Sequence, residues 1–343
     1  MRKPNVLFLI QHPDLPSSRV RVLDLLPALE ANDIQPQVEP YPSGMARKAR
    51  LVRSLSTWDA VVVQKKLPSP AESRLLRMAS KRLVYDLDDA VYQHHESVQG
   101  RSNFSRQRKF EAIARQAHLV LAGNQTLADA VRPYNDNIAI IPSAVPVLHI
   151  PQHDHTQPHT RCIIGWVGGC INLTQLALLR PVLADLHARH KIELRILSSE
   201  PIDMSPTPTT FIPWSLEKQT QEIAHFDIGV MPLPPSAHAS AKCGYKALQY
   251  MAACVPPVVS DTPCNRKIVD HAHEGFVAES WRTFAQHLET LIQNPALRHQ
   301  FGHAARRKVV AHYSIETVGQ QVAAALHHLV RQPHAHRAAP NLR

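Results

Sequence analysis

A lysine, a glycine and a glutamine near residue 242 could together bind a nucleotide diphosphate. A strand predicted over residues 226–231 is followed by a polar, proline-rich loop, and a helix begins around Lys242 to Gly244. A helix N-terminus presents unpaired N–H groups and the positive end of its dipole, which suits a diphosphate. Lys242 adds charge, Gly244 permits close approach of the backbone, and Gln249 could hydrogen-bond sugar hydroxyls. Residue by residue, an ordinary strand–helix–strand unit with a surface lysine is an equally good interpretation.

Three carboxylates follow another predicted strand, over residues 82–86. Asp86, Asp88 and Asp89 are closely spaced at the end of that strand, and His94 and His95 come shortly afterwards. Such carboxylates can orient hydroxyl groups or take a proton from an acceptor, and the histidines could act as a base or a hydrogen-bond donor. The alternative is a helix cap with surface acids. We favour Asp88 and Asp89 as the residues that face a binding cleft.

Short apolar runs alternate with helical patterns along the whole chain, which is typical of parallel sheets covered by helices on both faces. Strands are predicted over 5–10, 37–39, 59–63, 82–86, 119–122, 138–141, 161–167, 192–197, 226–231 and 257–260, with helices that include 18–32, 44–55 and 173–189. We expect Ser17 and Ser18 to cap the first helix. A proline- and histidine-rich stretch interrupts the rhythm, so the chain divides into two series.

The predicted architecture is therefore α/β, with two Rossmann-like parallel-sheet domains that face each other across an interdomain cleft. We expect one Rossmann-like domain over 1–145, a linker over 146–160, a second Rossmann-like domain over 161–331 and a disordered tail over 332–343. Ligands of such sheets bind at the carboxyl ends of the strands, and a cleft between domains is a favoured location for a site.

The segment from Ala241 to Val259 resembles the donor-nucleotide motif of GT-B glycosyltransferases, specifically glycosyltransferase family 4. That motif has a Glu, seven residues and a second Glu, then Ala-Met-Ala-x-Gly-x-Pro-Val-Val; here Ala241 and Gln249 stand at the two Glu positions and Cys254 at the glycine. The stretches from Val6 to Glu30, from Tyr85 to Tyr92, from Ile164 to Gly169 and from Pro295 to Ser314 also resemble family elements. The resemblance spans nearly the whole chain.

The resemblance implies transfer of a sugar from a nucleotide-diphosphate donor to a glycan, lipid-linked or other acceptor, with retention of configuration. It implies a donor site that includes Gly168, Gly169, Lys242, Cys243, Gly244 and Gln249. It also implies that no metal or other cofactor is needed besides the nucleotide-sugar co-substrate. Asp88 and Asp89 are thus predicted for the acceptor side rather than as metal ligands.

Two departures from the family leave alternatives open. Ala241 cannot contact the donor sugar as a Glu does, and an amide at Gln249 accepts ribose hydroxyl bonds more weakly than a carboxylate. No Lys or Arg follows Gly169 directly. The negative charge of the diphosphate would therefore be balanced by Lys242, the helix dipole and either Arg19 or Arg21. A non-catalytic sugar-nucleotide-binding homologue is the main alternative, and a nucleotide-sugar epimerase is a weaker one.

The positive charge of the chain concentrates in its first half. The formal net charge is +10, and the segment 44–82 holds ten Lys and Arg against Asp59 and Glu72. A basic helix with interleaved apolar residues suits an anionic membrane surface, which we predict as a partner. A solvated basic face is the alternative. Nucleic acid is not expected, because no nucleic-acid-binding motif is present and only 6% of residues are aromatic.

Composition excludes several classes of protein. No apolar run reaches the roughly 18 residues of a membrane span, and the first apolar run ends at Gln11 without a cleavage site, so we interpret it as a buried strand. The five cysteines lack metal-ligand spacing, which favours reduced thiols in a cytoplasmic protein. We expect a cytoplasmic enzyme, peripheral on the inner membrane if the basic segment docks there.

Overall fold

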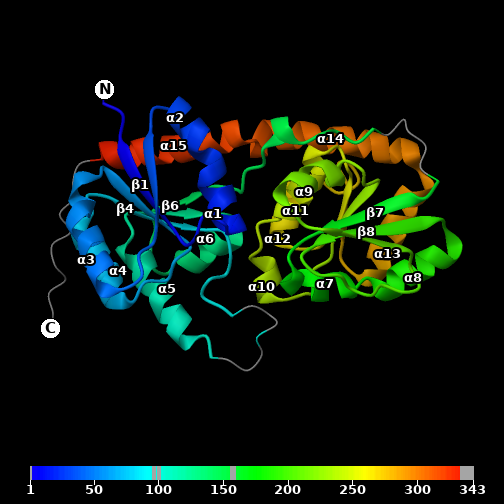
Figure 1. Ribbon diagram of the computed structural model, residues 1–343, viewed down its shortest axis with the longest axis horizontal. Coiled ribbons are helices and arrows are strands. Elements are labelled where there is room, and N and C mark those ends of the chain that lie inside the picture. Colours follow the sequence, from blue (N-terminus) through cyan, green and yellow to red (C-terminus); the bar gives the residue numbers. More distant parts are fainter. Residues whose placement is uncertain (1, 95–97, 99–101, 155–159, 333–343) are drawn as a thin grey trace.

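The computed structural model describes residues 2–94, 98, 102–154 and 160–332. All of the predicted tail except Gln332, and part of the predicted linker, lie outside the described residues. Two parallel sheets stand side by side, each covered by helices on both faces (Figure 1). No helix within these residues has the length and apolar character that a membrane crossing requires.

The first sheet contains six parallel strands in the order β2-β1-β3-β4-β5-β6. Its strands are β1 (Asn5–Ile10), β2 (Gln35–Pro40), β3 (Ala60–Gln64), β4 (Leu83–Leu87), β5 (Leu119–Ala122) and β6 (Ile138–Ile140). Side chains along a strand point alternately to the two faces. Leu7 and Leu9 therefore pack into one apolar cluster, while Val6, Phe8 and Ile10 pack into another across the sheet. The almost unbroken apolar run of β1 reflects burial on both faces.

The second sheet has the order β12-β11-β10-β7-β8-β9, which read from the other edge is the Rossmann order. Its strands are β7 (Cys162–Val167), β8 (Ile192–Ser198), β9 (Thr209–Pro213), β10 (Ile228–Met231), β11 (Pro257–Ser260) and β12 (Phe276–Ala278). The edge strands β9 and β12 were not predicted. β9 is polar and partly exposed, and β12 is only three residues long, so neither carries a clear apolar pattern.

Helices cover both sheets. On the first domain these are α1 (Pro16–Arg21), α2 (Leu26–Ala31), α3 (Met45–Ser54), α4 (Pro70–Ala79), α5 (Phe104–Gln116) and α6 (Gln125–Val131). The second series comprises α7 (Leu173–Ala177), α8 (Arg180–Arg189), α9 (Leu216–Ile223), α10 (Ala237–Ser240), α11 (Tyr245–Ala252), α12 (Pro263–Ile268), α13 (Trp281–Gln293) and α14 (Pro295–Tyr313). The predicted helix over 173–189 is interrupted, because Pro181 begins a new helix at its first turn.

The predicted serine cap of the first helix is wrong. α1 begins at Pro16 with Leu15 at its N-cap, since proline is pre-organised for the first helical turn. Ser18 lies inside the helix, is fully buried, and donates a hydrogen bond to Gln64 Oε1 at 3.4 Å. Its hydroxyl therefore joins two elements of the first domain instead of satisfying the helix end.

The last helix returns to the first domain. After α14, the chain passes Ser314 and continues as α15 (Ile315–Arg331) across the top of the molecule in Figure 1. Val318, Val322 and Leu326 of α15 are buried in the same apolar cluster as one face of the first sheet. The range predicted for the second domain thus ends with a helix that packs on the first. Two chain passages, near 145 and near 314, cross between the domains side by side, since Val145 N–H donates to Tyr313 O at 2.8 Å.

Candidate active site in the interdomain cleft

A cleft of about 630 Å³ lies between the domains, at the carboxyl ends of strands from both sheets. Strand order reverses between β1 and β3 in the first sheet and between β7 and β10 in the second, and these are the points where such sheets bind ligands. Every residue predicted for the catalytic and donor sites lines this cleft: Arg19, Asp88, Asp89, Gly168, Gly169, Lys242, Cys243, Gly244 and Gln249.

Two glycines shape the second-domain wall of the cleft. Gly244 starts α11 with φ +64°, and a Cβ there would lie 2.3 Å from Ile268 Cδ1, so another residue would be strained and crowded. Gly168 follows β7 beside the Trp166 ring. A Cβ at Gly168 would lie 2.9 Å from Lys246 Cε, so the missing side chain leaves room for that lysine.

Lys246 is the residue of this wall that the sequence analysis missed. Its Nζ lies 5.4 Å from the centroid of the Trp166 ring, and its side chain lines the cleft. Within the described part of the chain, no acidic side chain pairs with it. Burial, followed by repulsion from Lys242, lowers the pKa of Lys246 to about 7. The signal in the sequence was its place two residues after Gly244, in the first turn of the predicted helix, where a cation lies near a bound diphosphate.

The other predicted donor-side residues flank Lys246. Lys242 Nζ lies 3.4 Å from His238 Nε2, and Gln249 is 5% exposed at the cleft wall. Arg19 comes from the first domain and lies across the cleft beside Tyr245, with which it shares a hydrogen bond, while its Nε is 3.8 Å from Asp24. Trp214, at the end of the unpredicted strand β9, is 40% exposed and also lines the cleft.

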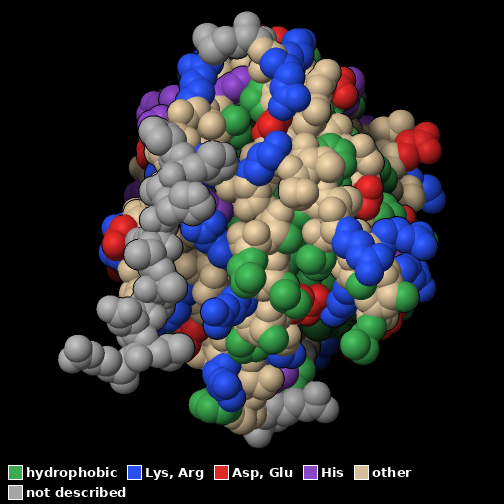
Figure 2. All heavy atoms as spheres, turned by 90° about the vertical axis from the view of Figure 1, so that its left-hand side faces the viewer, with side chains coloured by type: hydrophobic (Ala, Val, Ile, Leu, Met, Phe, Trp, Pro, Cys, Tyr) green, Lys and Arg blue, Asp and Glu red, His purple; other side chains and the backbone are tan. Residues whose placement is uncertain are grey.

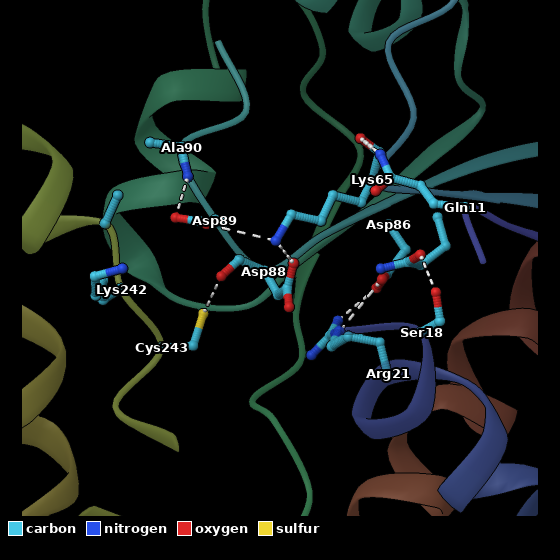
Figure 3. A network of polar contacts seen from close by, with 12 residues as sticks. Gln11, Ser18, Arg21, Lys65, Asp86, Asp88, Asp89, Ala90, Lys242 and Cys243 are labelled. Carbon is cyan, nitrogen blue, oxygen red and sulfur yellow. Dashed lines mark hydrogen bonds and ion pairs between the residues drawn. The ribbon is translucent and has the colours of Figure 1, made fainter. Parts of the chain in front are cut away.

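The carboxylates of the first-domain wall are held by a lysine (Figure 3). Lys65 Nζ lies 3.1 Å from Asp88 Oδ1 and 3.4 Å from Asp89 Oδ2. Burial disfavours the charge of Lys65, but the two carboxylates outweigh burial and raise its pKa. Burial likewise opposes ionisation of Asp89, yet Lys65, Lys242 and His238 together lower the pKa of Asp89. Both walls of the cleft therefore carry charged groups.

Lys65 was predicted only as part of the basic segment. It follows β3 with φ +58°, a left-handed conformation that is uncommon for a lysine and is often found at functional sites. Its backbone N–H donates to Asp86 O at 2.7 Å, and its carbonyl accepts from Gln11 Nε2 at 3.4 Å. These bonds fix the backbone so that the side chain extends toward Asp88 and Asp89.

The prediction that Arg21 could compensate a diphosphate is wrong. Arg21 is buried within the first domain, where its Nη2 lies 2.5 Å from Asp86 Oδ1 and its Nε lies 3.3 Å from Oδ2. Its Nη1 donates to the carbonyls of Ile141 and Pro142 at 2.7 and 3.0 Å. Asp86 therefore neutralises Arg21, and neither residue lines the cleft.

The motif segment also joins the two domains. Asn124 Nδ2 donates to Ala241 O at 2.9 Å and to Lys242 O at 3.2 Å, and Cys243 Sγ donates to Asp88 O at 3.1 Å. Ala241 is fully buried in an apolar cluster of the first domain, so the position of the family's first Glu faces away from the cleft lining. Burial raises the pKa of the Cys243 thiol.

The histidines after the acidic trio do not join the site. His94 is absent from the cleft lining, and its backbone N–H donates to Asn103 Oδ1 at 2.8 Å. His95 lies outside the described residues. Over the ranges that the structure describes, no group of three or more His, Cys, Asp or Glu residues could hold a metal ion.

Comparisons with known proteins agree with this architecture. Residues 227–308, which hold the motif segment, match the model of the family described as glycosyl transferases group 1. HepE from Anabaena, solved in complex with UDP and glucose, is similar over 95% of this chain and 100% of its own, with a TM-score of 0.70 and 15% identity. The chain has the GT-B fold. The predicted fold class is thereby confirmed.

Other GT-B structures are similar over most of their length. Sucrose-phosphate synthase from Thermosynechococcus elongatus has a TM-score of 0.71 at 14% identity, over 96% of this chain and 99% of that one. An alpha-glucosyltransferase in complex with UDP and a 13-mer DNA has a TM-score of 0.63 at 11% identity, over 94% and 99%. The chain matches none of the curated proteins by sequence. These findings support the group 1 family, while the narrower family 4 stays a prediction.

Proposed function

We propose that this GT-B protein transfers a sugar from a nucleotide-diphosphate donor to an acceptor hydroxyl. The observation that carries the proposal is Lys246, a cation in the cleft wall without an acidic partner among the described residues. A partly buried cation is costly unless an anion accompanies it, and a diphosphate is an anion of suitable charge. Lys246 thus takes the role expected of the cation that is missing after Gly169.

The donor would bind along the second-domain wall. Lys246, Lys242 and the N-terminus of α11 would hold the diphosphate, with Gly168 and Gly169 leaving space for it. Gln249 would hydrogen-bond the ribose hydroxyls, and the exposed face of Trp214 offers a stacking surface for the base. Arg19 would approach the diphosphate from the opposite domain.

The reaction would break the bond between the anomeric carbon and the diphosphate oxygen and form a bond to the acceptor oxygen. The leaving diphosphate gains negative charge, which Lys246 and Lys242 would stabilise. We further propose retention of configuration, with the departing diphosphate accepting the proton of the acceptor hydroxyl. Asp88 and Asp89, held beside Lys65, would orient the acceptor, and no step requires a metal. The acceptor class proposed is a glycan or a lipid-linked sugar.

A second candidate is a protein that binds the nucleotide sugar without turning it over. Ala241 favours it, because this position carries no carboxylate and is buried against the first domain. Epimerisation of the donor is the weaker alternative. These candidates differ in product, so one assay can separate them.

The test combines binding with turnover. We expect a nucleoside diphosphate at 100 times its Kd to stabilise the protein by about 2.7 kcal/mol, seen as a rise in Tm. Lys246→Met should abolish this rise while leaving the Tm of the free protein equal or higher, because an unpaired buried charge is removed. Lys218→Met, at an exposed site on α9, is the matched control.

A panel of nucleotide sugars then decides between the candidates. Release of nucleoside diphosphate together with a glycosylated or hydrolysed sugar supports the transferase. Binding without release would favour the non-catalytic protein, and an isomerised donor would favour the epimerase. If no nucleotide stabilises the wild-type protein, the proposed donor site is wrong. The anomeric configuration of the product, measured by NMR, tests retention.

A further inference from the structure

The helices α3, α4 and α5 form one layer on the first domain, with α3 and α4 side by side and α5 next to α4 (Figure 1). Large apolar side chains on this layer are exposed to solvent. Met45 is 89% exposed, Leu75 51%, Met78 72% and Phe104 67%. Figure 2, which faces this end of the molecule, shows hydrophobic side chains interspersed with Lys and Arg. Exposed apolar residues that cluster in this way mark an interaction surface.

The same layer is strongly basic. Its three helices contain ten Lys and Arg but only Glu72 and Glu111 as acids. Fewer cations of the predicted basic segment 44–82 are available to a partner than the sequence suggests, because several of them make contacts within the protein. Lys65 binds the cleft carboxylates, Lys48 binds Glu72, Lys81 binds Asp59, Arg77 contacts His118, and Arg82 donates to carbonyls at the end of α15.

Five of the other arginines are available to a partner. In the described residues, no acidic side chain pairs with any of these five, which come from all three helices: Arg47, Arg50, Arg53, Arg74 and Arg108. We name these arginines, together with Met45, Leu75, Met78 and Phe104, the basic apolar face. Cations and exposed apolar side chains alternate on it, a combination that suits an anionic surface with an apolar interior.

The basic apolar face belongs to the same sheet as the acceptor wall of the cleft. In a parallel sheet each helix begins near the carboxyl end of the preceding strand, and the cleft residues Lys65 and Asp88 follow the ends of β3 and β4. Met45 and Phe104 stand in the first turns of α3 and α5, at that same edge of the sheet. No residue of these three helices lines the cleft, so the basic apolar face and the acceptor wall are separate parts of the same domain.

We propose that the basic apolar face docks onto the surface of an anionic lipid bilayer, so that the acceptor is presented at that surface. The statement about the acceptor rests on the proposed transferase function, whereas the docking itself does not. Arginines neutralise the lipid headgroups, and the Met, Leu and Phe side chains enter the boundary between headgroups and acyl chains. Nucleic acid would use the arginines alone and would gain little from the exposed apolar side chains.

Vesicle sedimentation of the full chain tests the docking. The protein should bind vesicles of phosphatidylcholine mixed with phosphatidylglycerol and should not bind phosphatidylcholine alone. Arg47→Gln, Arg50→Gln and Arg53→Gln combined should weaken binding on the order of 100-fold at low salt. Met45→Ser with Met78→Ser should weaken it roughly tenfold, because apolar area no longer enters the bilayer. Lys191→Gln, Lys218→Gln and Arg307→Gln combined remove equal charge from exposed sites on the second domain, and this control should bind as wild type.

Three outcomes would overturn the proposal. The first is no binding to anionic vesicles at low salt, and the second is equal loss in the arginine variant and its control. The third is tighter binding to a DNA duplex that the methionine changes do not alter, which would assign the face to nucleic acid. Nucleotide-induced Tm shifts measured on the same samples distinguish failure of the docking from failure of the proposed transferase function.

Discussion

The two walls of the cleft differ in how their charges are balanced. On the first-domain wall, Asp88 and Asp89 share Lys65, so each charged group of this cluster has a partner of opposite sign. On the second-domain wall, Lys246 faces the cleft, and burial followed by repulsion from Lys242 lowers its pKa. A compensated cluster has a fixed geometry before a ligand arrives, whereas an uncompensated cation gains most of its stabilisation from the ligand.

This difference indicates that the two walls have different roles in the proposed reaction. The second-domain wall would recognise the donor by supplying the charge that its diphosphate needs. The first-domain wall would orient neutral hydroxyls, for which ionised and pre-oriented carboxylates are good acceptors. Changes on one wall should therefore alter one part of the reaction and leave the other intact.

The largest effect is expected from Asp89→Asn on the first-domain wall. Turnover of the nucleotide sugar should fall about 100-fold, because an ionised acceptor for the incoming hydroxyl is lost. The Kd of the nucleoside diphosphate should change by only about a few-fold, because the interaction of Asp89 with Lys242 is the one electrostatic link to the proposed diphosphate site that Asp89 shows. Turnover is measured as nucleoside diphosphate release, and Kd by calorimetry.

Asp14→Asn is the matched control for this experiment. Asp14 lines the same cleft, but its side chain is 88% exposed, and among the described residues its carboxylate forms an ion pair with His12 alone. Its removal should change turnover by less than about twofold. A large rise in the Kd of the diphosphate for Asp89→Asn, with unchanged turnover, would contradict the division between the walls.

If Lys246 on the second-domain wall binds the diphosphate, the Kd of the diphosphate should depend on pH. The pKa of Lys246 is lowered to about 7, first by burial and then by Lys242, so the free protein loses this charge above pH 7. Because the diphosphate binds the charged form, its Kd should rise about tenfold per pH unit from pH 7 to 9 and stay flat just below 7. As binding weakens with rising pH, the free protein should become more stable, since the unfolded lysine keeps its proton up to about pH 10.4. Its free energy of unfolding therefore rises between pH 7 and 10.

Arginine at this position provides the control. Lys246→Arg keeps its charge throughout this range, so the Kd should become independent of pH. Tyr245 on the same helix has its pKa raised to about 12 and does not titrate in this window. A wild-type Kd that is equal at pH 7 and pH 9 would show that Lys246 does not bind the diphosphate.

The sequence predicted the framework of this site better than its charge pairs. Apolar runs such as β1 are recognisable because both faces are buried, and Gly244 and Lys242 belong to one local segment. The pair of Arg21 with Asp86 and that of Lys65 with Asp88 join residues far apart in the chain. No local spacing reveals such pairs, since only the order of the strands brings them together. For that reason Arg21 was misassigned and Lys65 was missed.

One departure from the family motif, at Cys254, has a consequence for the backbone. The family's glycine after the helix is Cys254 here, and the structure places Cys254 at φ +60°, in the left-handed region. A residue with a side chain is strained in that region by roughly 1–2 kcal/mol relative to glycine. The strain lies at the C-terminal end of α11, the helix that carries Lys246, and at the opposite end from the cleft.

The smallest predicted effect is a stability change at Cys254 that should leave the donor wall unaffected. Both Cys254→Gly and Cys254→Ala remove the thiol, so their difference reports the backbone alone. Cys254→Gly should exceed Cys254→Ala in free energy of unfolding by about 1 kcal/mol, measured by chemical denaturation. At the neighbouring Ala253, where φ is −88°, glycine should instead destabilise by roughly 0.5–1 kcal/mol. The diphosphate Kd should remain unchanged in all three variants, because α11 presents Lys246 from its other end. A change in Kd that follows stability would mean that the donor wall is not fixed before the ligand binds.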